Sequence, residues 1–133
     1  MFSGLKVREP EKLSPPERRL LQEVLEVVEN HLSEKDFNVT RLCLLLGVSR
    51  VTVHRRLKSI AGKSATEFIR SIKLYHAASL LKNEKLPVRQ AARMSGFYNL
   101  SYFSKCFREE FGMCPSEFIN LTPWPPLQIG EGE

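Results

Sequence analysis

Hydrophobic residues recur every three or four positions along most of this chain, and no stretch alternates between apolar and polar residues as a half-buried strand does. In the first such stretch Leu20, Val24 and Val28 form one apolar face, whereas Glu23 and Glu26 occupy the other. With their caps, the predicted helices cover residues 14–32, 38–46, 49–61, 64–82, 87–94, 99–111 and 115–119. The periodicity therefore predicts an all-α fold of about seven helices.

Residue types that cap helices support these boundaries. The pattern Ser-x-x-Glu, typical of a capping box, occurs at Ser14–Glu17 and at Ser64–Glu67. Each of three more helices is preceded by a single polar residue that can cap it and is followed by a glycine. The preceding residues are Asn38, Ser49 and Asn99, and the glycines are Gly47, Gly62 and Gly112. Pro87 offers no side-chain cap to the helix that follows it.

Two stretches, residues 39–58 and 88–108, resemble each other at a period of about 50 residues. Gly47 matches Gly96, and the small Cys43 matches the small Ala92. A helix-turn-helix needs a glycine that permits its tight turn, and a small residue that lets the second helix approach the first. Two such copies, joined by one long helix, predict two helix-turn-helix subdomains.

The repeat also predicts how the chain is divided. The expected parts are a flexible leader (1–13), the first helix-turn-helix subdomain (14–63), a linker helix (64–82), the second helix-turn-helix subdomain (83–121) and a flexible tail (122–133). Prolines surround Trp124 in the tail, so no regular structure is expected there.

Charge is distributed unevenly along the chain. Residues 37–108 hold 14 lysines and arginines against 2 acids, whereas residues 1–36 hold 6 against 8 and residues 109–133 hold none against 5. A basic middle segment is typical of a protein that binds a polyanion, although a solvated basic surface has the same composition. The repeat favours the first interpretation, because the acid-free range from Phe37 to Thr66 contains the second helix of the first unit.

The second helix of each unit is the candidate DNA-recognition helix. Arg55 and Lys105 occupy equivalent positions, and each is expected to contact a guanine edge or a phosphate. Arg55 is the stronger candidate because a guanidinium can bind in a bidentate way. The candidate residues for double-stranded DNA are Arg50, Val51, Thr52, His54, Arg55 and Lys58 in the first unit, and Asn99, Leu100, Ser101, Tyr102, Ser104, Lys105 and Arg108 in the second.

Motifs of other protein classes are absent from the sequence. It has no glycine-rich phosphate loop, paired-carboxylate motif or nucleophile–base motif, so no catalytic residue or enzymatic activity is predicted. Its three cysteines are expected to be buried free thiols, and its three scattered histidines lack ligand spacing, so neither a metal nor a cofactor is expected.

Without a signal peptide or a membrane span, the chain is expected to be cytoplasmic and to make no membrane contact. Four cations outside the recognition helices, Arg70, Lys73, Arg89 and Arg93, are interpreted as solvated charges, although Arg89 lies close enough to a helix N-terminus to approach the DNA backbone.

A more specific set of residues lies in the second unit. The set comprises Val88, Ala92, Gly96–Phe97, Ser101–Gly112 and Pro115–Phe118. It closely resembles the C-terminal signature of the AraC/XylS family of bacterial transcription regulators. Residues 62–70 resemble the start of that family's linker helix, and the likeness covers about Pro16 to Ile119. The resemblance implies sequence-specific transcription regulation, with the third and sixth helices in successive major grooves.

Partners beyond DNA are implied by the same resemblance. In such proteins the module commonly follows a ligand-sensing domain, a receiver or a hybrid sensor kinase of a two-component system. We therefore expect an N-terminal sensor or receiver domain in the full-length protein, and contact with RNA polymerase. The chain itself has no room for such a domain, so it is either a free-standing member or an excised C-terminal domain. The alternative function is a basic helical module that binds an acidic protein partner.

The second unit departs from the family pattern at two kinds of position. Ala91 and Ser95 stand where the family prefers larger aliphatic residues, and Cys114 replaces the usual Ser or Thr cap. We expect looser packing of the first helix of this unit. The first unit, with more basic residues on its recognition helix, is expected to dominate base reading, and the second to contribute more through backbone contacts.

Overall fold

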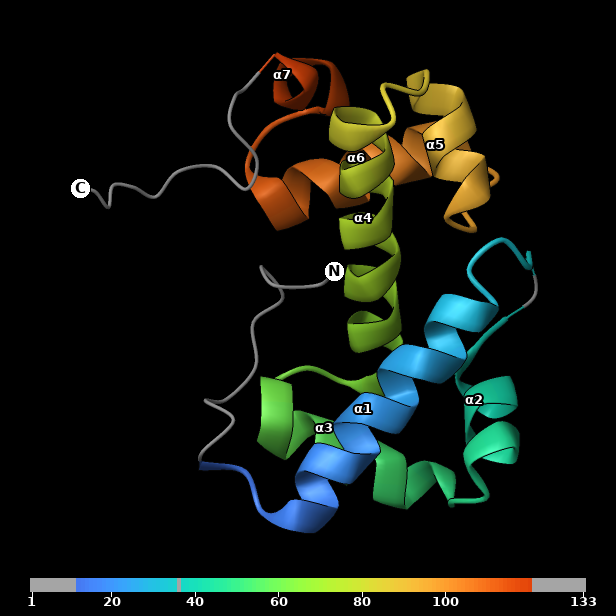
Figure 1. Ribbon diagram of the computed structural model, residues 1–133, viewed down its shortest axis with the longest axis vertical. Helices are drawn as coiled ribbons and strands as arrows, with labels where there is room; N and C mark the ends of the chain where they lie inside the picture. The colour runs from blue at the N-terminus through green and yellow to red at the C-terminus, as the bar shows by residue number, and fades with distance from the viewer. Residues whose placement is uncertain (1–11, 36, 121–133) are drawn as a thin grey trace.

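Helices and short turns make up the computed structural model, which describes residues 12–35 and 37–120 (Figure 1). The helices are α1 (Pro15–Asn30), α2 (Val39–Leu46), α3 (Arg50–Ala61), α4 (Ala65–Asn83), α5 (Val88–Met94), α6 (Leu100–Phe111) and α7 (Pro115–Ile119). No strand occurs within the two described ranges, so the predicted all-α class and its seven helices are confirmed. Most of the predicted leader, and the predicted tail with Trp124, lie outside the described residues.

α4 runs through the middle of the molecule, with α1, α2 and α3 at one end and α5, α6 and α7 at the other (Figure 1). Of its 19 residues, 11 are buried, among them Phe68, Ile72 and Leu81. A helix that is apolar around most of its circumference belongs to an interior rather than to a surface. The sequence predicted a linker helix, and the structure makes that helix part of both hydrophobic cores.

The first core joins α1, α2, α3 and the first half of α4. Each helix contributes a side chain without exposed surface, and these are Val24, Leu42, Leu57 and Phe68. Burial of such side chains supplies the main stabilisation of a small domain. Leu13, which we assigned to the leader, is also buried. The packed part of the chain therefore begins before the predicted boundary at Ser14.

Aromatic rings dominate the second core, which lies between the second half of α4 and the helices α5, α6 and α7. The ring centroid of Phe107 lies 5.6 Å from that of Phe103 and 5.2 Å from that of Phe118. All three side chains are fully buried. Aromatic pairs at these separations contribute beyond the apolar area that they bury.

A small residue of α5 and the polar residue that follows the helix fit against this core. Ala91 and Ser95, which depart from the family pattern, are both fully buried. The Ser95 hydroxyl lies 3.0 Å from Nδ1 of His76 on α4, so its burial is accompanied by a hydrogen bond. As expected, Pro87 gives α5 no side-chain cap.

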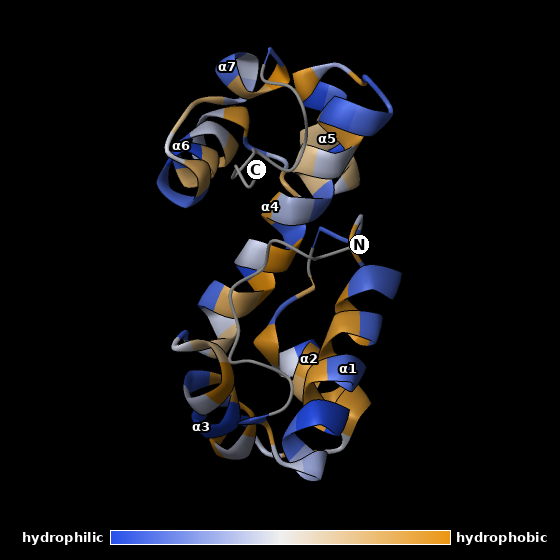
Figure 2. Ribbon diagram, turned by 60° about the vertical axis from the view of Figure 1, so that its left-hand side comes forward, coloured by the Kyte–Doolittle hydropathy of each residue, from blue (hydrophilic) through white to orange (hydrophobic). Residues whose placement is uncertain are grey.

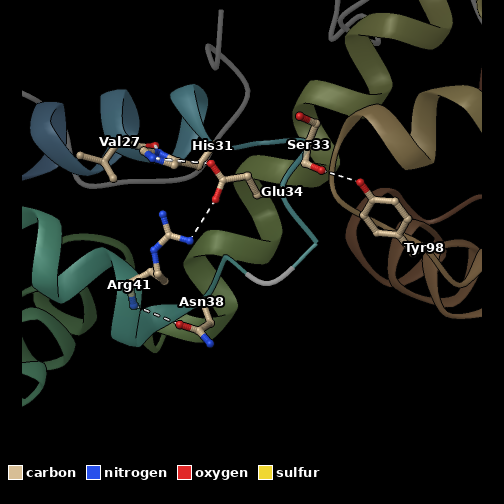
Figure 3. Close-up of polar contacts among 7 residues, drawn as sticks. All are labelled: Val27, His31, Ser33, Glu34, Asn38, Arg41 and Tyr98. Atoms are coloured by element: carbon tan, nitrogen blue, oxygen red, sulfur yellow. Dashed lines mark hydrogen bonds and ion pairs between the residues drawn. The ribbon is translucent and has the colours of Figure 1, made fainter.

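The two subdomains also contact each other outside α4. Tyr98, in the turn between α5 and α6, donates a hydrogen bond from its hydroxyl to the backbone carbonyl of Ser33 in the α1–α2 loop (Figure 3). A 3.0 Å ion pair between Glu34 and Arg41 holds that loop against α2. The relative placement of the two subdomains therefore has a second support besides the shared helix.

Other expectations concerned cysteines, metals and membranes. Cys43 and Cys106 are buried free thiols as predicted, whereas Cys114 is only partly buried because it precedes the short helix α7 near the molecular surface. Within residues 12–35 and 37–120, no three His, Cys, Asp or Glu side chains come together in a way that could bind a metal. No helix in these ranges combines the length and apolarity that a membrane span requires.

Candidate nucleic-acid interface

The local sequence of α3 separates a buried face from an exposed one. Ser49 caps the helix by accepting a hydrogen bond from the Thr52 backbone N–H at 3.2 Å. Val53 and Leu57, four residues apart, have no exposed surface and attach the helix to the first core. The remaining face presents Val51, His54, Arg55 and Lys58 to solvent. This is the outward face that the sequence predicted for the first recognition helix.

Two other predicted residues at the start of α3 are engaged in local contacts. The Arg50 guanidinium donates a hydrogen bond to Oγ1 of Thr40 on α2 at 3.1 Å. The Thr52 hydroxyl accepts one from Oγ of Ser49 at 2.9 Å and is partly buried. Arg50 has four further N–H donors, so it can still contact DNA. Thr52 takes part in the cap of the helix, and its contact with DNA stays a prediction.

His54 has a hydrogen bond that the sequence did not reveal. The backbone N–H of Ala65, at the start of α4, donates to Nδ1 of His54 at 3.3 Å. Because Nδ1 accepts, the proton of the neutral imidazole must lie on Nε2. The exposed edge of His54 is therefore a hydrogen-bond donor, suited to an acceptor such as guanine N7, guanine O6 or a phosphate oxygen.

The second exposed face belongs to α6. Oδ1 of Asn99 accepts a hydrogen bond from the Tyr102 backbone N–H at 2.9 Å, which caps the helix. Phe103 and Phe107 hold the opposite face in the second core. The predicted outward residues Leu100, Ser101, Tyr102, Lys105 and Arg108 are exposed, and Ser104 is partly buried. This face carries two cations, Lys105 and Arg108, whereas α3 exposes three of its predicted residues that are cations, Arg50, Arg55 and Lys58.

Of the four cations interpreted as solvated charges, Lys73 is buried, so the interpretation is wrong for this residue. Arg89 and Arg93 are exposed and Arg70 is partly buried, but Lys73 has only 9% of its surface exposed. Burial removes water from its ammonium group and lowers the pKa of Lys73. Its Cε and Nζ lie 3.4 Å from the position that a Cβ on Gly96 would occupy. The turn that covers Lys73 comes from a distant part of the sequence, so local periodicity could not reveal this burial.

α3 and α6 lie on the same side of the molecule, to the left of α4 in Figure 2. A hollow on α3 itself is lined by side chains of its exposed face, namely Arg50, Val51, His54, Arg55 and Lys58, together with Ser59 and Ser64. A second cleft, of about 670 Å³, lies between the subdomains and reaches the first residue of α3 and the first turn of α6. The molecule therefore exposes two helical faces on one side, and the cleft reaches the start of both helices.

Comparison with protein families identifies two overlapping matches. Residues 42–120 match the family described as "Helix-turn-helix domain". Residues 13–59, which hold the first unit, match the family described as "Bacterial regulatory protein, Fis family". The first match covers both predicted recognition helices and α4.

Among curated proteins, the chain is similar to a histidine kinase and to several transcription regulators. It is 34% identical over 121 residues to Histidine kinase P4 of Formosa agariphila, which is 90% of this chain and 9% of the kinase. It is 30% identical over 97 residues to the HTH-type transcriptional regulator GbdR of Pseudomonas aeruginosa, 73% of this chain and 26% of that protein. The chain therefore spans about a tenth to a quarter of the length of these relatives.

Solved structures of the same fold include other DNA-binding regulators. The C-terminal domain of AraT, a response regulator from Geobacillus stearothermophilus, has a TM-score of 0.68 and 26% identity, covering 90% of this chain and 98% of that domain. An AraC-type regulator from Chromobacterium violaceum has a TM-score of 0.71 at 23% identity, covering 80% of this chain and 94% of that one, and shares the fold. In ToxT K231A from Vibrio cholerae the likeness covers 36% of that chain, with a TM-score of 0.68 and 26% identity.

Proposed function

This chain belongs to the AraC/XylS family of helix-turn-helix DNA-binding domains, and we propose that it reads double-stranded DNA by placing α3 and α6 in successive major grooves. The observation that carries the proposal is the pair of exposed recognition faces on one side of the molecule. The major groove of B-DNA admits an α-helix, and it returns to the same face of the duplex about every 10 base pairs. One molecule then contacts one face of its operator.

Different side chains of α3 and α6 have different roles in this proposal. Arg55 reads a guanine edge in a bidentate way, and His54 donates from Nε2 to an acceptor beside it. Lys105 occupies the corresponding place on α6. The remaining contacts, to phosphates, sugars and base edges, are assigned to Arg50, Val51, Lys58, Asn99, Leu100, Ser101, Tyr102, Ser104 and Arg108. Thr52 supports α3 through its cap.

The placement of the two subdomains has a consequence for the DNA. They are joined by α4 and by the contact of Tyr98 with Ser33, which limits independent adjustment of the two recognition helices. A duplex that receives both helices then bends to fit the protein, at a cost that depends on its sequence.

Further domains complete the regulator in this proposal. The relatives include a histidine kinase and the C-terminal domain of a response regulator, which supports a place in a two-component system. An N-terminal sensor or receiver domain controls the module, which works in the cytoplasm and contacts RNA polymerase at the promoter.

The proposal is tested by selecting duplexes from a random library with this chain and mapping the bound site by hydroxyl-radical footprinting. Two protected patches about 10 base pairs apart on one face are expected. Affinity is expected to fall steeply between about 50 and 200 mM salt, because phosphate contacts release counterions. Protection of a single groove would contradict simultaneous insertion, and duplex affinity that hardly changes with salt would contradict the phosphate contacts.

A further inference from the structure

The cleft between the subdomains is lined by parts of four helices. α4 contributes Arg70 and Lys73, and the starts of α2, α3 and α6 converge on the same space. Arg50 is the first residue of α3, and Lys35 comes from the α1–α2 loop. Among the described lining residues there are four cations and no carboxylate. An anion that entered this cleft would meet attraction from several directions.

Neutral donors add to the same preference. The first N–H groups of a helix lack intrahelical acceptors and carry partial positive charge. α2 begins at Val39, and the Asn38 side chain caps only the Arg41 N–H, at 3.0 Å. The N–H groups of Val39 and Thr40 thus belong to the start of a helix that lines the cleft. Asn99 and Tyr102, at the start of α6, line it from the second subdomain.

Confining these cations in a cleft whose described lining holds no carboxylate has an energetic cost. Lys73 is buried, and the loss of hydration lowers the pKa of its ammonium group. Arg70 is partly buried near Tyr102 on α6. A bound anion would offset the lost hydration, so the cleft is better suited to an occupied state than to an empty one.

We propose that this cleft holds the sugar-phosphate backbone of the DNA that lies between the two major grooves, with Lys35, Arg50, Arg70 and Lys73 facing its phosphates. The inference rests on the proposed function, because Arg50 at the start of α3 and Asn99 and Tyr102 at the start of α6 line the cleft. A duplex whose major grooves hold both recognition helices carries its backbone past the opening of this cleft. A DNA phosphate, rather than a free anion, is therefore the occupant.

The test measures binding of a fluorescent duplex of about 30 base pairs, selected in vitro with the wild-type chain, between about 50 and 200 mM potassium chloride. The variants are Lys35→Ala and Arg70→Gln, with Arg19→Ala and Arg19→Gln as matched controls, because Arg19 is an exposed residue of α1 outside the cleft. Each cleft variant is expected to reduce the slope of log affinity against log salt by about 1, equally on all duplex sequences. The Arg19 variants are expected to keep the wild-type slope.

Ethylation interference locates the phosphates concerned. Ethylation midway between the two protected grooves is expected to block wild-type binding and to have less effect on the two cleft variants. Thermal unfolding checks that each variant folds, and Lys35 is exposed, so its replacement leaves both cores intact. Equal salt slopes for cleft and control variants, with Arg55→Ala still weakened on the same duplex, would overturn the cleft assignment and leave the proposed function standing.

Discussion

At the scale of single residues, Arg55 and His54 are neighbours on α3 that the fold prepares for DNA in different ways. Arg55 is exposed and brings a planar group with five donors, which needs no support to recognise a guanine edge. His54 is oriented by the N–H of Ala65, which leaves its Nε2 as a donor. Base reading by α3 therefore combines one intrinsically suited side chain with one whose role depends on the start of α4.

Replacement of Arg55 tests its assignment. Arg55→Ala is expected to cost about 1–3 kcal/mol of binding free energy and to relax the preference at one base position, because a bidentate contact to a base edge is lost. The measurement is binding to the selected duplex and to its single-base variants. Equal weakening on every sequence would instead identify Arg55 as a phosphate contact.

His76 carries a pH dependence of folding. Burial lowers the pKa of His76 below its ordinary value of 6.5, and the negative charge of Glu29 opposes that shift only in part. The unfolded chain therefore binds the proton at a higher pH than the folded chain does. Between the folded pKa and 6.5 the unfolded state holds more protons, so the free energy of unfolding decreases as the pH falls through this window.

A variant separates this contribution from the rest of the molecule. His76→Gln is expected to lose less stability than the wild type between about pH 7.5 and pH 5, because glutamine can bond to Ser95 without titrating. Urea unfolding at several pH values supplies the free energies. Identical losses in the two proteins would show that His76 does not contribute.

At the scale of elements, the two helix-turn-helix turns look equivalent in sequence but differ in their surroundings. Gly47 has a φ of +70°, and a Cβ added there would meet no atom within 4 Å. Gly96 has a φ of +90°, and its Cβ would lie 2.5 Å from the backbone oxygen of Leu32 in the first subdomain. The first glycine serves its own turn, whereas the second also permits contact between subdomains.

Alanine at each turn is expected to have different effects. Gly47→Ala should cost about 1–2 kcal/mol, the penalty of a left-handed conformation with a side chain. Gly96→Ala should cost about 3 kcal/mol or more, since the backbone of the α1–α2 loop must also move. Chemical denaturation gives both values. Equal losses would contradict the close approach at Gly96.

At the scale of the whole molecule, α4 joins the two helix-turn-helix units into one folding unit. Its first half contributes Phe68 and Ile72 to the first core, and its second half contributes Leu74 and Leu81 to the second. Phe111, at the end of α6, packs against both cores. Neither subdomain can lose its core without exposing part of the helix that supports the other.

Unfolding of the chain is therefore expected to occur in one transition, with equal calorimetric and van't Hoff enthalpies. Tyr98→Phe should reduce the free energy of unfolding by about 0.5–1.5 kcal/mol without splitting the transition, because it removes only the hydrogen bond to Ser33. Differential scanning calorimetry of both proteins checks this. Two resolved transitions in the wild type would contradict the shared role of α4.

The sequence by itself determined the local features of this protein. Helix periods, capping boxes at Ser14 and Ser64 and the glycines that follow the helices are interactions within a few residues, so they can be read in order along the chain. The outward faces of α3 and α6 followed for the same reason, because a helix that buries Val53 and Leu57 must expose Arg55. The repeat and the family signature then indicated DNA.

Only the tertiary structure decided what depends on the meeting of distant segments. The burial of Lys73 beside Gly96, the donor state of His54 and the contact of Tyr98 with Ser33 each join residues from different elements. The same holds for α4, which appeared in sequence as a linker and became the centre of two cores. Long-range packing sets solvation and orientation, and it also forms the cationic cleft between the recognition helices, which no local pattern encodes.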